Sequence, residues 1–233
     1  VTALRLLGGL RIAEGFDQPN FAIGFGTSTT RFVAASTGFS ISRNGPNVDS
    51  VIDWVSVRQI LGNHAFQSDN ANKPTWVADG AKRAFVFNGT TQRVTCTAPV
   101  PTANLLMGVA IRTGAIGARR VIWSNKTTNA GLSLELAATG ALTVVAGNGT
   151  SDVTLTGATL SANTDYRVLL TYSGALLTLT INGVPTSAAL SSLAAGSATT
   201  TIGAAPDDSA FWNGRIYVIG WRSATAITAS DTD

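Results

Sequence analysis

The chain has 233 residues, of which 45% are hydrophobic and only 12% charged, about half of the roughly 25% charged residues usual in globular domains. The net charge is +3. The basic residues are scattered without interleaved aromatic residues, so we expect no nucleic-acid partner. No apolar stretch approaches the ~18 residues of a membrane span, so the sequence predicts no membrane-spanning segment.

Low charge is typical of subunits that bury much of their surface against one another, because an isolated monomer usually needs surface charge to stay soluble. We therefore expect a homo-oligomer or an association with the other proteins of a particle, although a large uncharged sheet surface explains the composition equally well. The single cysteine, Cys96, excludes an intramolecular disulfide. It lies in an alternating strand pattern, where we expect it to be buried as a small hydrophobic residue.

Residues 1–60 form an N-terminal segment of distinct composition, because five of the nine phenylalanines fall within it. A short strand is predicted over Leu10–Ile12, and Val51–Ile60 is apolar enough for a strand or one short helix. The segment supplies either the opening strands of the following domain or an arm that docks on a neighbour. The five phenylalanines are Phe16, Phe21, Phe25, Phe32 and Phe39.

Residues 61–233 contain many short apolar runs separated by turn residues, which is typical of an antiparallel sandwich. In one predicted hairpin, Leu177, Leu179 and Ile181 alternate with Thr178 and Thr180. One face of this strand therefore packs on a core, and the threonine face meets solvent or a partner. The predicted strands cover residues 84–87, 105–112, 121–123, 131–136, 142–145, 167–172, 176–181, 199–203 and 214–221.

The order of several short motifs resembles that of laminin-G-like domains from phage, prophage and bacterial surface proteins. Gly62–Ala65 (GNHA) followed by Asn72–Trp76 (NKPTW) resembles the start of these domains. Phe85–Gly89 (FVFNG) resembles their next strand and turn, with Asn88 in place of the usual Asp. Further similarities are found at Thr164–Gly174, Leu179–Gly183 and Ile202–Ile216.

The resemblance covers about residues 63–228 and leaves residues 1–60 outside it. It implies an all-β fold, a two-sheet antiparallel jelly-roll sandwich of the concanavalin-A-like kind. Members of this family bind glycans or proteins, often with a calcium ion at the rim, and some relatives in the wider superfamily degrade polysaccharides.

The sequence contains little that would support catalysis. A glycosidase needs two carboxylates roughly 5–9.5 Å apart, but Glu14 and Glu135 are the only glutamates. We expect Glu135, alone in an apolar run, to be a single charge on the solvent face. His64 is the only histidine, which together with one cysteine argues against zinc. We assign no catalytic residue and expect the protein not to be an enzyme.

Calcium is the one metal that the resemblance suggests, and it requires six to eight oxygen ligands. Asp207 and Asp208 lie in the loop before the closing strand, where relatives place a rim ligand. Asn125 and Asn129 belong to another loop that we expect to approach the same rim. Plain solvated carboxylates are the alternative interpretation of the Asp207-Asp208 pair.

Glycan binding requires a flat aromatic ring that stacks on a sugar and polar groups that meet its hydroxyls. We expect Trp123 and Trp221 to lie in the core, as well as Trp54. Burial of Trp212 is the alternative to a role in binding. The candidate ligand-binding residues are Trp212, Asn213, Trp76, Asp69, Asn70 and Asn72.

Three functional hypotheses remain at this point. The first is a non-catalytic module that recognises surface polysaccharide as a spike, fibre or decoration of a phage-like particle, located on a virion or an extracellular surface. The second is a purely structural virion or surface-layer subunit. The third is a polysaccharide-degrading enzyme, which would need two acids, or a cluster of Tyr, His and Arg, converging in a groove.

Overall fold

The computed structural model describes residues 9–13, 40–44, 65, 67–97 and 100–223. The chain divides into two compact units, Val1–Leu61 and Gly62–Asp233. In the described residues, the only helix is the short 3-10 helix η1 (Asn70–Asn72), and the other regular elements are β-strands. No helix in these residues is long and apolar enough to cross a membrane.

The first unit contains one described strand pair. Strand β1 (Gly9–Ala13) pairs antiparallel with β2 (Ser40–Asn44), with Gly9 opposite Asn44 and Ala13 opposite Ser40. The strand predicted over Leu10–Ile12 is therefore confirmed within β1, whereas β2 was not anticipated. The five phenylalanines and the Val51–Ile60 stretch lie outside the described residues.

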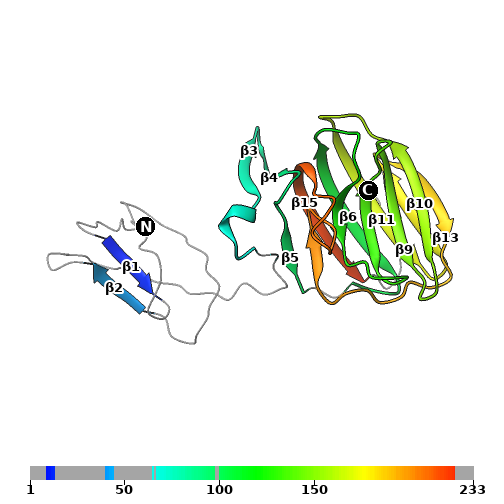
Figure 1. The fold of residues 1–233 in the computed structure, drawn as a ribbon, viewed down its shortest axis with the longest axis horizontal. Helices are drawn as coiled ribbons and strands as arrows, with labels where there is room; N and C mark the ends of the chain where they lie inside the picture. Colours follow the sequence, from blue (N-terminus) through cyan, green and yellow to red (C-terminus); the bar gives the residue numbers. More distant parts are fainter. Residues whose placement is uncertain (1–8, 14–39, 45–64, 66, 98–99, 224–233) are drawn as a thin grey trace. The chain divides into compact units, whose positions relative to one another are not determined.

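The second unit is a sandwich of two antiparallel sheets (Figure 1). The six-stranded sheet has the order β10-β9-β8-β7-β14-β5, and the seven-stranded sheet has the order β13-β12-β11-β6-β15-β4-β3. The strands are β3 (Thr75–Asp79), β4 (Lys82–Asn88), β5 (Val94–Cys96), β6 (Leu105–Thr113), β7 (Arg120–Ser124), β8 (Leu132–Leu136), β9 (Ala141–Gly147), β10 (Asp152–Thr159), β11 (Asp165–Ser173), β12 (Leu176–Ile181), β13 (Val184–Ala189), β14 (Thr200–Ile202) and β15 (Asn213–Ser223).

Local turn chemistry explains why these strands pair with their neighbours. Strands β12 and β13 are joined by Asn182 and Gly183, which have φ angles of +50° and +84°. Two successive positive φ angles define the tight hairpin turn whose twist matches that of paired strands, and Asn-Gly is its preferred sequence. The turn fixes the register of the hairpin, with Ile181 directly opposite Val184.

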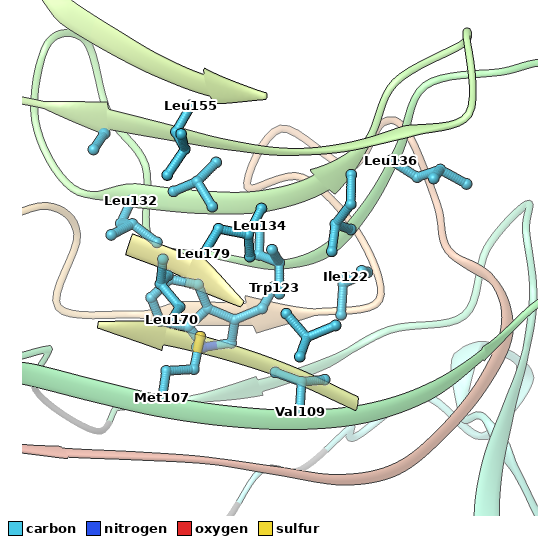
Figure 2. Close-up of a cluster of buried hydrophobic side chains, with 14 of the residues drawn as sticks. Met107, Val109, Ile122, Trp123, Leu132, Leu134, Leu136, Leu155, Leu170 and Leu179 are labelled. Carbon is cyan, nitrogen blue, oxygen red and sulfur yellow. The ribbon is translucent and has the colours of Figure 1, made fainter. Parts of the chain in front are cut away.

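The core fills the space between the sheets. Along β6, Leu105, Met107, Val109 and Ile111 are buried and point toward the six-stranded sheet. Figure 2 shows Trp123 of β7 within this cluster, between Met107 of β6 and Leu134 of β8. Trp123 is fully buried and makes an edge-to-face contact with Trp221, at 5.3 Å between ring centroids. The core positions expected for these two tryptophans are confirmed, and Trp54 lies outside the described residues.

The sequence predicted the burial of Cys96 but not that of Glu135. Cys96 is buried, as expected. Glu135 is only 8% exposed and forms an ion pair with Arg119, with 2.5 Å between Oε2 and Nη2. The expectation of an isolated charge on the solvent face was therefore wrong, because the neighbouring loop supplies a guanidinium that pairs with Glu135.

The core predicts a large difference between two leucine truncations. We expect Leu134→Ala to lower the free energy of unfolding by about 2–5 kcal/mol, because Leu134 is fully buried and its removal leaves a cavity. Leu176→Ala is the control, since Leu176 is 50% exposed and surface changes usually stay within about 0.5 kcal/mol. Chemical denaturation measures both values. Equal losses in the two variants would contradict the described core.

Candidate functional site

The two faces of the seven-stranded sheet differ in chemistry because side chains alternate along each strand. On β6, the side chains of Met107 and Val109 face the core, whereas Gly108, Ala110 and Arg112 face away from the six-stranded sheet. We call the face that points away from the six-stranded sheet the outer face. Directly opposed residues on neighbouring strands share a face, so the pairing register identifies its members.

A group of charged side chains gathers at one end of the outer face, and we call it the ionic cluster. Arg112 of β6 forms a two-pronged ion pair with Asp165 of β11, at 2.8 Å from Nε to Oδ1 and 3.1 Å from Nη2 to Oδ2. Arg215 of β15 lies 2.5 Å from the Oδ2 atom of Asp79 on β3. The members of the cluster are Asp79, Lys82, Arg112, Asp165, Arg215 and Tyr217.

Tyr217 connects the two acids of this cluster. The register between β15 and β6 shifts between Ile216 and Val218, and this bulge leaves Tyr217 unpaired with β6. The Tyr217 hydroxyl lies 2.6 Å from Oδ2 of Asp79 and 3.1 Å from Oδ1 of Asp165. The Lys82 ammonium lies 5.1 Å from the centre of the Tyr217 ring and 3.5 Å from Asp165.

These contacts fix the protonation states of the ionic cluster. Hydrogen bonds from Tyr217 and then from Arg215 lower the pKa of Asp79 from 3.8 to about 2. The hydrogen bonds from Arg112 lower the pKa of Asp165. Burial, followed by the hydrogen bonds to Asp79 and Asp165, raises the pKa of Tyr217 to about 12. Both carboxylates therefore stay ionised at neutral pH, and the phenol keeps its proton.

The pKa shifts of the two acids and of the tyrosine disfavour proton transfer by these groups. A glycosidase general acid needs a raised pKa so that it carries a proton at neutral pH, but both acids here are shifted in the other direction. A catalytic tyrosine base needs a lowered pKa, and that of Tyr217 is raised. The ionic cluster presents fixed charges rather than a proton donor and acceptor.

A second feature lies on the other face of the β3–β4 hairpin. Trp76 of β3 stands directly opposite Phe85 of β4, with 4.5 Å between the ring centroids and 55° between the ring planes. Trp76 is 50% exposed and Phe85 is 44% exposed. We call these two residues the aromatic pair. They alternate with Asp79 and Lys82, so the aromatic pair and the ionic cluster occupy opposite faces of one hairpin.

A polar loop leads directly into the strand that carries Trp76. Asp69 caps helix η1 by accepting hydrogen bonds from the Ala71 backbone at 2.9 Å and from the Asn72 amide at 2.8 Å. The exposed Asn70 side chain accepts a hydrogen bond from Lys73 at 2.6 Å. The backbone of Asn72 accepts from the backbone of Arg93, which fixes the loop beside the start of β5. The candidate residues Asp69, Asn70, Asn72 and Trp76 thus lie on one short, ordered stretch.

Comparison with solved structures gives the fold. The receptor-binding domain of botulinum neurotoxin type G is 11% identical over 73% of this chain and 45% of its own, with a TM-score of 0.55. Domains LG4-5 of the mouse laminin alpha1 chain are 14% identical over 62% of this chain and 44% of theirs, with a TM-score of 0.50. The sandwich is a concanavalin-A-like jelly roll. This confirms the all-β, two-sheet architecture that the motifs predicted.

Sequence comparison adds no closer relative to this jelly roll. No known family model matches the chain, and no curated protein matches it. A third similar structure, described as showing that cell entry of botulinum neurotoxin type C depends on interaction with two ganglioside molecules, is 14% identical over 64% of this chain and 41% of its own, with a TM-score of 0.50. The chain spans less than half the length of these three proteins.

The interpretation of Trp212 as a sugar-stacking residue is corrected by the structure. Trp212 is fully buried, so neither face of its indole ring is available to a ligand. Its neighbour Asn213 bridges loops of the jelly roll. The Asn213 side chain accepts a hydrogen bond from the Ala115 backbone at 3.0 Å and donates one to the Asn88 carbonyl at 3.4 Å. Both residues hold the fold together rather than facing a ligand.

The residues proposed for calcium do not form a site. Ala210, in the loop that carries Asp207 and Asp208, bonds Val121 near the start of β7, whereas Asn125 follows the end of that strand. Four residues of extended chain between Val121 and Asn125 span about 13 Å. The two loops therefore lie at opposite ends of β7, and Asn125 and Asn129 do not approach the Asp207-Asp208 rim.

The side chains of these four residues are also engaged elsewhere. Asp208 pairs with Arg93, and Asp207 accepts a hydrogen bond from Ser209. Asn125 is 2% exposed and bonds the Leu132 backbone, and Asn129 donates to the Thr150 carbonyl. Within the described part of the chain, no three acidic, histidine or cysteine side chains gather as a metal site.

Sequence reasoning missed the ionic cluster. Its residues come from β3, β4, β6, β11 and β15, which are far apart in the chain. The only local signal was that Arg112 and Asp165 occupy outward positions at the ends of otherwise apolar strands. The pairing of Asp165 with Arg112, and of Arg112 with Arg215, becomes visible only when the strand order is known.

The lowered pKa of Asp79 predicts a pH-dependent contribution to stability. Its folded-state pKa of about 2 lies below the ordinary 3.8, so the carboxylate stabilises the fold above about pH 4 and loses this effect as the pH falls through about 2. We expect Asp79→Asn to lower the melting temperature at pH 7, and the difference from the wild type to shrink between pH 4 and 2. Thermal unfolding followed by circular dichroism measures this.

The control for this experiment is Asp207→Asn, which removes an exposed carboxylate outside the ionic cluster. A deficit of Asp79→Asn that stays constant from pH 7 to pH 2 would contradict the assigned ion pairs.

Proposed function

We propose that the jelly roll is a non-catalytic module that binds surface polysaccharide through the aromatic pair. The observation that carries this proposal is the exposure of Trp76 and Phe85, which leaves two large adjacent rings uncovered by the sandwich. Exposed apolar patches with polar residues at their rim mark ligand or partner sites, and the two rings of the aromatic pair are in contact with each other, unlike a single exposed side chain.

The chemistry around the aromatic pair fits a sugar. Pyranose rings offer apolar C–H faces that stack on aromatic rings, and their hydroxyls need hydrogen-bond donors and acceptors nearby. Trp76 offers the larger ring. The loop residues Asp69 and Asn70 are exposed on the same stretch of chain. Their oxygens accept hydrogen bonds within the loop, and each oxygen keeps a second lone pair that can accept from a sugar hydroxyl.

The comparisons support binding rather than catalysis. Among the similar structures, that of botulinum neurotoxin type C is described as depending on ganglioside interaction for cell entry, and that of type G is a receptor-binding domain. The ionic cluster, whose acids remain ionised, supplies no general acid. A non-catalytic role is therefore the one that both the similar folds and the local chemistry favour.

We further propose that the module works on a particle or cell surface, as a spike, fibre or decoration of a phage-like particle. The motifs that resemble laminin-G-like domains of phage and bacterial surface proteins motivate this, as does the low charge of 12%, which suits a subunit in an assembly. The same low charge favours a second candidate, a purely structural virion or surface-layer subunit. In that case the aromatic pair is a contact between subunits.

The proposed sugar contact predicts a selective loss of binding. On a glycan array, with calcium present and absent, we expect the wild type to bind a subset of bacterial surface polysaccharides. Trp76→Ala should weaken this binding about tenfold, because nucleic-acid bases stacked on an aromatic side chain lose about 1–3 kcal/mol on its substitution by alanine, and a pyranose ring covers an area similar to that of a base. Leu176→Ala, which removes an equally exposed hydrophobic side chain on β12, should bind as the wild type does.

Light scattering of the same three proteins separates the two candidates. A wild type that binds no glycan and forms oligomers that Trp76→Ala dissociates would identify the aromatic pair as a subunit contact and overturn the proposed sugar site.

A further inference from the structure

The sequence contains five Asn-Gly pairs, and four of them lie entirely within the described residues. Asparagine loses its side-chain amide most readily when glycine follows it, because glycine has no side chain to hinder attack by its own backbone nitrogen. A fold suppresses this reaction where it holds the amide away from that nitrogen or engages the nitrogen in a hydrogen bond. The four described pairs begin at Asn88, Asn148, Asn182 and Asn213, and the fifth, which begins at Asn44, extends beyond the described residues.

The fold protects the pair Asn88-Gly89 by holding its amide. The Oδ1 atom of Asn88 accepts hydrogen bonds from three successive backbone N–H groups, those of Thr90, Thr91 and Gln92, at 2.9, 3.0 and 3.2 Å. The Nδ2 atom donates to the Thr91 hydroxyl at 3.1 Å. The amide therefore turns toward the Gly89 nitrogen only if these four hydrogen bonds break.

Two further pairs are protected at their glycine. Gly149 donates its backbone N–H to the Asn129 carbonyl at 2.8 Å, so the nitrogen that would attack is already engaged. Gly214 lies between two strands, opposite Phe87 of β4 and Thr113 of β6. A residue in the interior of a sheet is released only when the strands on both sides separate, which costs more free energy than fraying at an edge.

The pair Asn182-Gly183 has the least protection of the four. It forms the turn between β12 and β13, and both of its residues are exposed. Among the described residues, the Asn182 side chain has one hydrogen-bond partner, the Arg167 N–H, at 2.8 Å from Oδ1. The Gly183 N–H donates to no group in the described part of the chain, and the space beside Gly183 is open to 4 Å. Water therefore reaches both reacting groups.

The strand that follows this turn lies at the edge of its sheet. Among the described strands, β13 pairs with β12 alone. The first four residues of β13, from Val184 to Ser187, are all exposed. Elements with few buried contacts open locally at a lower free-energy cost than core strands do. When this end of the hairpin opens, the Asn182 amide leaves Arg167 and reaches the Gly183 nitrogen.

We propose that Asn182-Gly183 is a site of spontaneous deamidation, in which water is the only other reactant. The Gly183 backbone nitrogen forms a bond to Cγ of Asn182 as it loses its proton. The bond from Cγ to Nδ2 breaks, and ammonia leaves with that proton. The five-membered imide that results adds one water molecule and opens at either of its carbonyls, which gives aspartate or isoaspartate at position 182.

The two products have different effects on the hairpin. Aspartate keeps the length of the main chain and an oxygen that accepts from the Arg167 N–H, so it preserves the turn. Isoaspartate inserts a methylene group into the main chain of a two-residue turn. Because this turn fixes the register, with Ile181 opposite Val184, we expect isoaspartate to release β13 from β12 and to leave the core intact.

This inference does not depend on the proposed sugar contact. The hairpin of β12 and β13 lies at one edge of the seven-stranded sheet, and the aromatic pair lies on β3 and β4 at the other edge. We expect deamidated protein to bind glycans as the fresh protein does, so a failure of either proposal leaves the other unaffected.

The test is peptide mapping by mass spectrometry after the folded full chain has been incubated at mildly alkaline pH, where the attacking nitrogen loses its proton more readily. Asn182 should deamidate at least about tenfold faster than each of the other three described asparagines, because every hydrogen bond that must open first lowers the reactive fraction several-fold. At mildly acidic pH the reaction should nearly stop. A methyltransferase specific for isoaspartate measures that product.

The matched control is the same chain in denaturant, where all Asn-Gly pairs should react at similar rates because the fold no longer protects any of them. Equal rates at the four pairs in the folded chain, or a faster reaction at Asn88, Asn148 or Asn213, would overturn the proposal. So would an unreacted Asn182 in folded protein after the denatured chain has been converted completely.

A variant and an exchange measurement test the effect on the hairpin. Asn182→Asp imitates the aspartate product and should keep the wild-type melting temperature and the slow hydrogen exchange of the β13 amides. Aged protein enriched in isoaspartate should exchange the β13 amides faster, with exchange in β6 unchanged. Slow β13 exchange in the isoaspartate form would contradict the released strand.

Discussion

The strict alternation of side chains along β6 is the constraint on which both the core and the outer face depend. Met107 and Val109 fill the space between the sheets, while Gly108, Ala110 and Arg112 form the middle of the outer face. A shift of one residue in the pairing of β6 with β11 or β15 would exchange these two sets. It would bury Arg112 and expose the core. The hydrophobic core thus determines where the charges of the outer face lie.

Two neighbouring sheets of unequal width explain why the aromatic pair remains exposed. The seven-stranded sheet has one more strand than the sheet it faces, and β3 is its edge strand. At the corresponding edge of the other sheet, β5 has only three residues. Trp76 on β3 therefore has no full strand opposite it, in contrast to Trp123, which packs in the core with Met107 of β6 from the facing sheet. The geometry of the sandwich, and not the type of residue, separates the exposed tryptophan from the buried ones.

This also explains how far the sequence could predict the structure. The fold followed from short alternating runs and Asn-Gly turns, because strand formation and tight hairpins depend on neighbouring residues. The distinction between Trp76 and Trp212 did not, because both adjoin polar loops and asparagines, and only the position of each strand in its sheet decides which ring is covered. The same limit applies to Glu135, which was expected on the surface but pairs with Arg119 from a neighbouring loop. Ion pairs between distant strands, such as that of Arg112 with Asp165, depend on strand order and leave no local pattern.

The ionic cluster shows that two acids close together do not make a catalytic site. Asp79 and Asp165 approach the same tyrosine hydroxyl, which resembles the carboxylate pairs of glycosidases in composition. The arginines reverse the consequence, because each guanidinium stabilises the ionised form of its partner and lowers the pKa of that carboxylate. The ion pairs and hydrogen bonds that lower these pKa values also link four strands, β3, β6, β11 and β15, across the outer face.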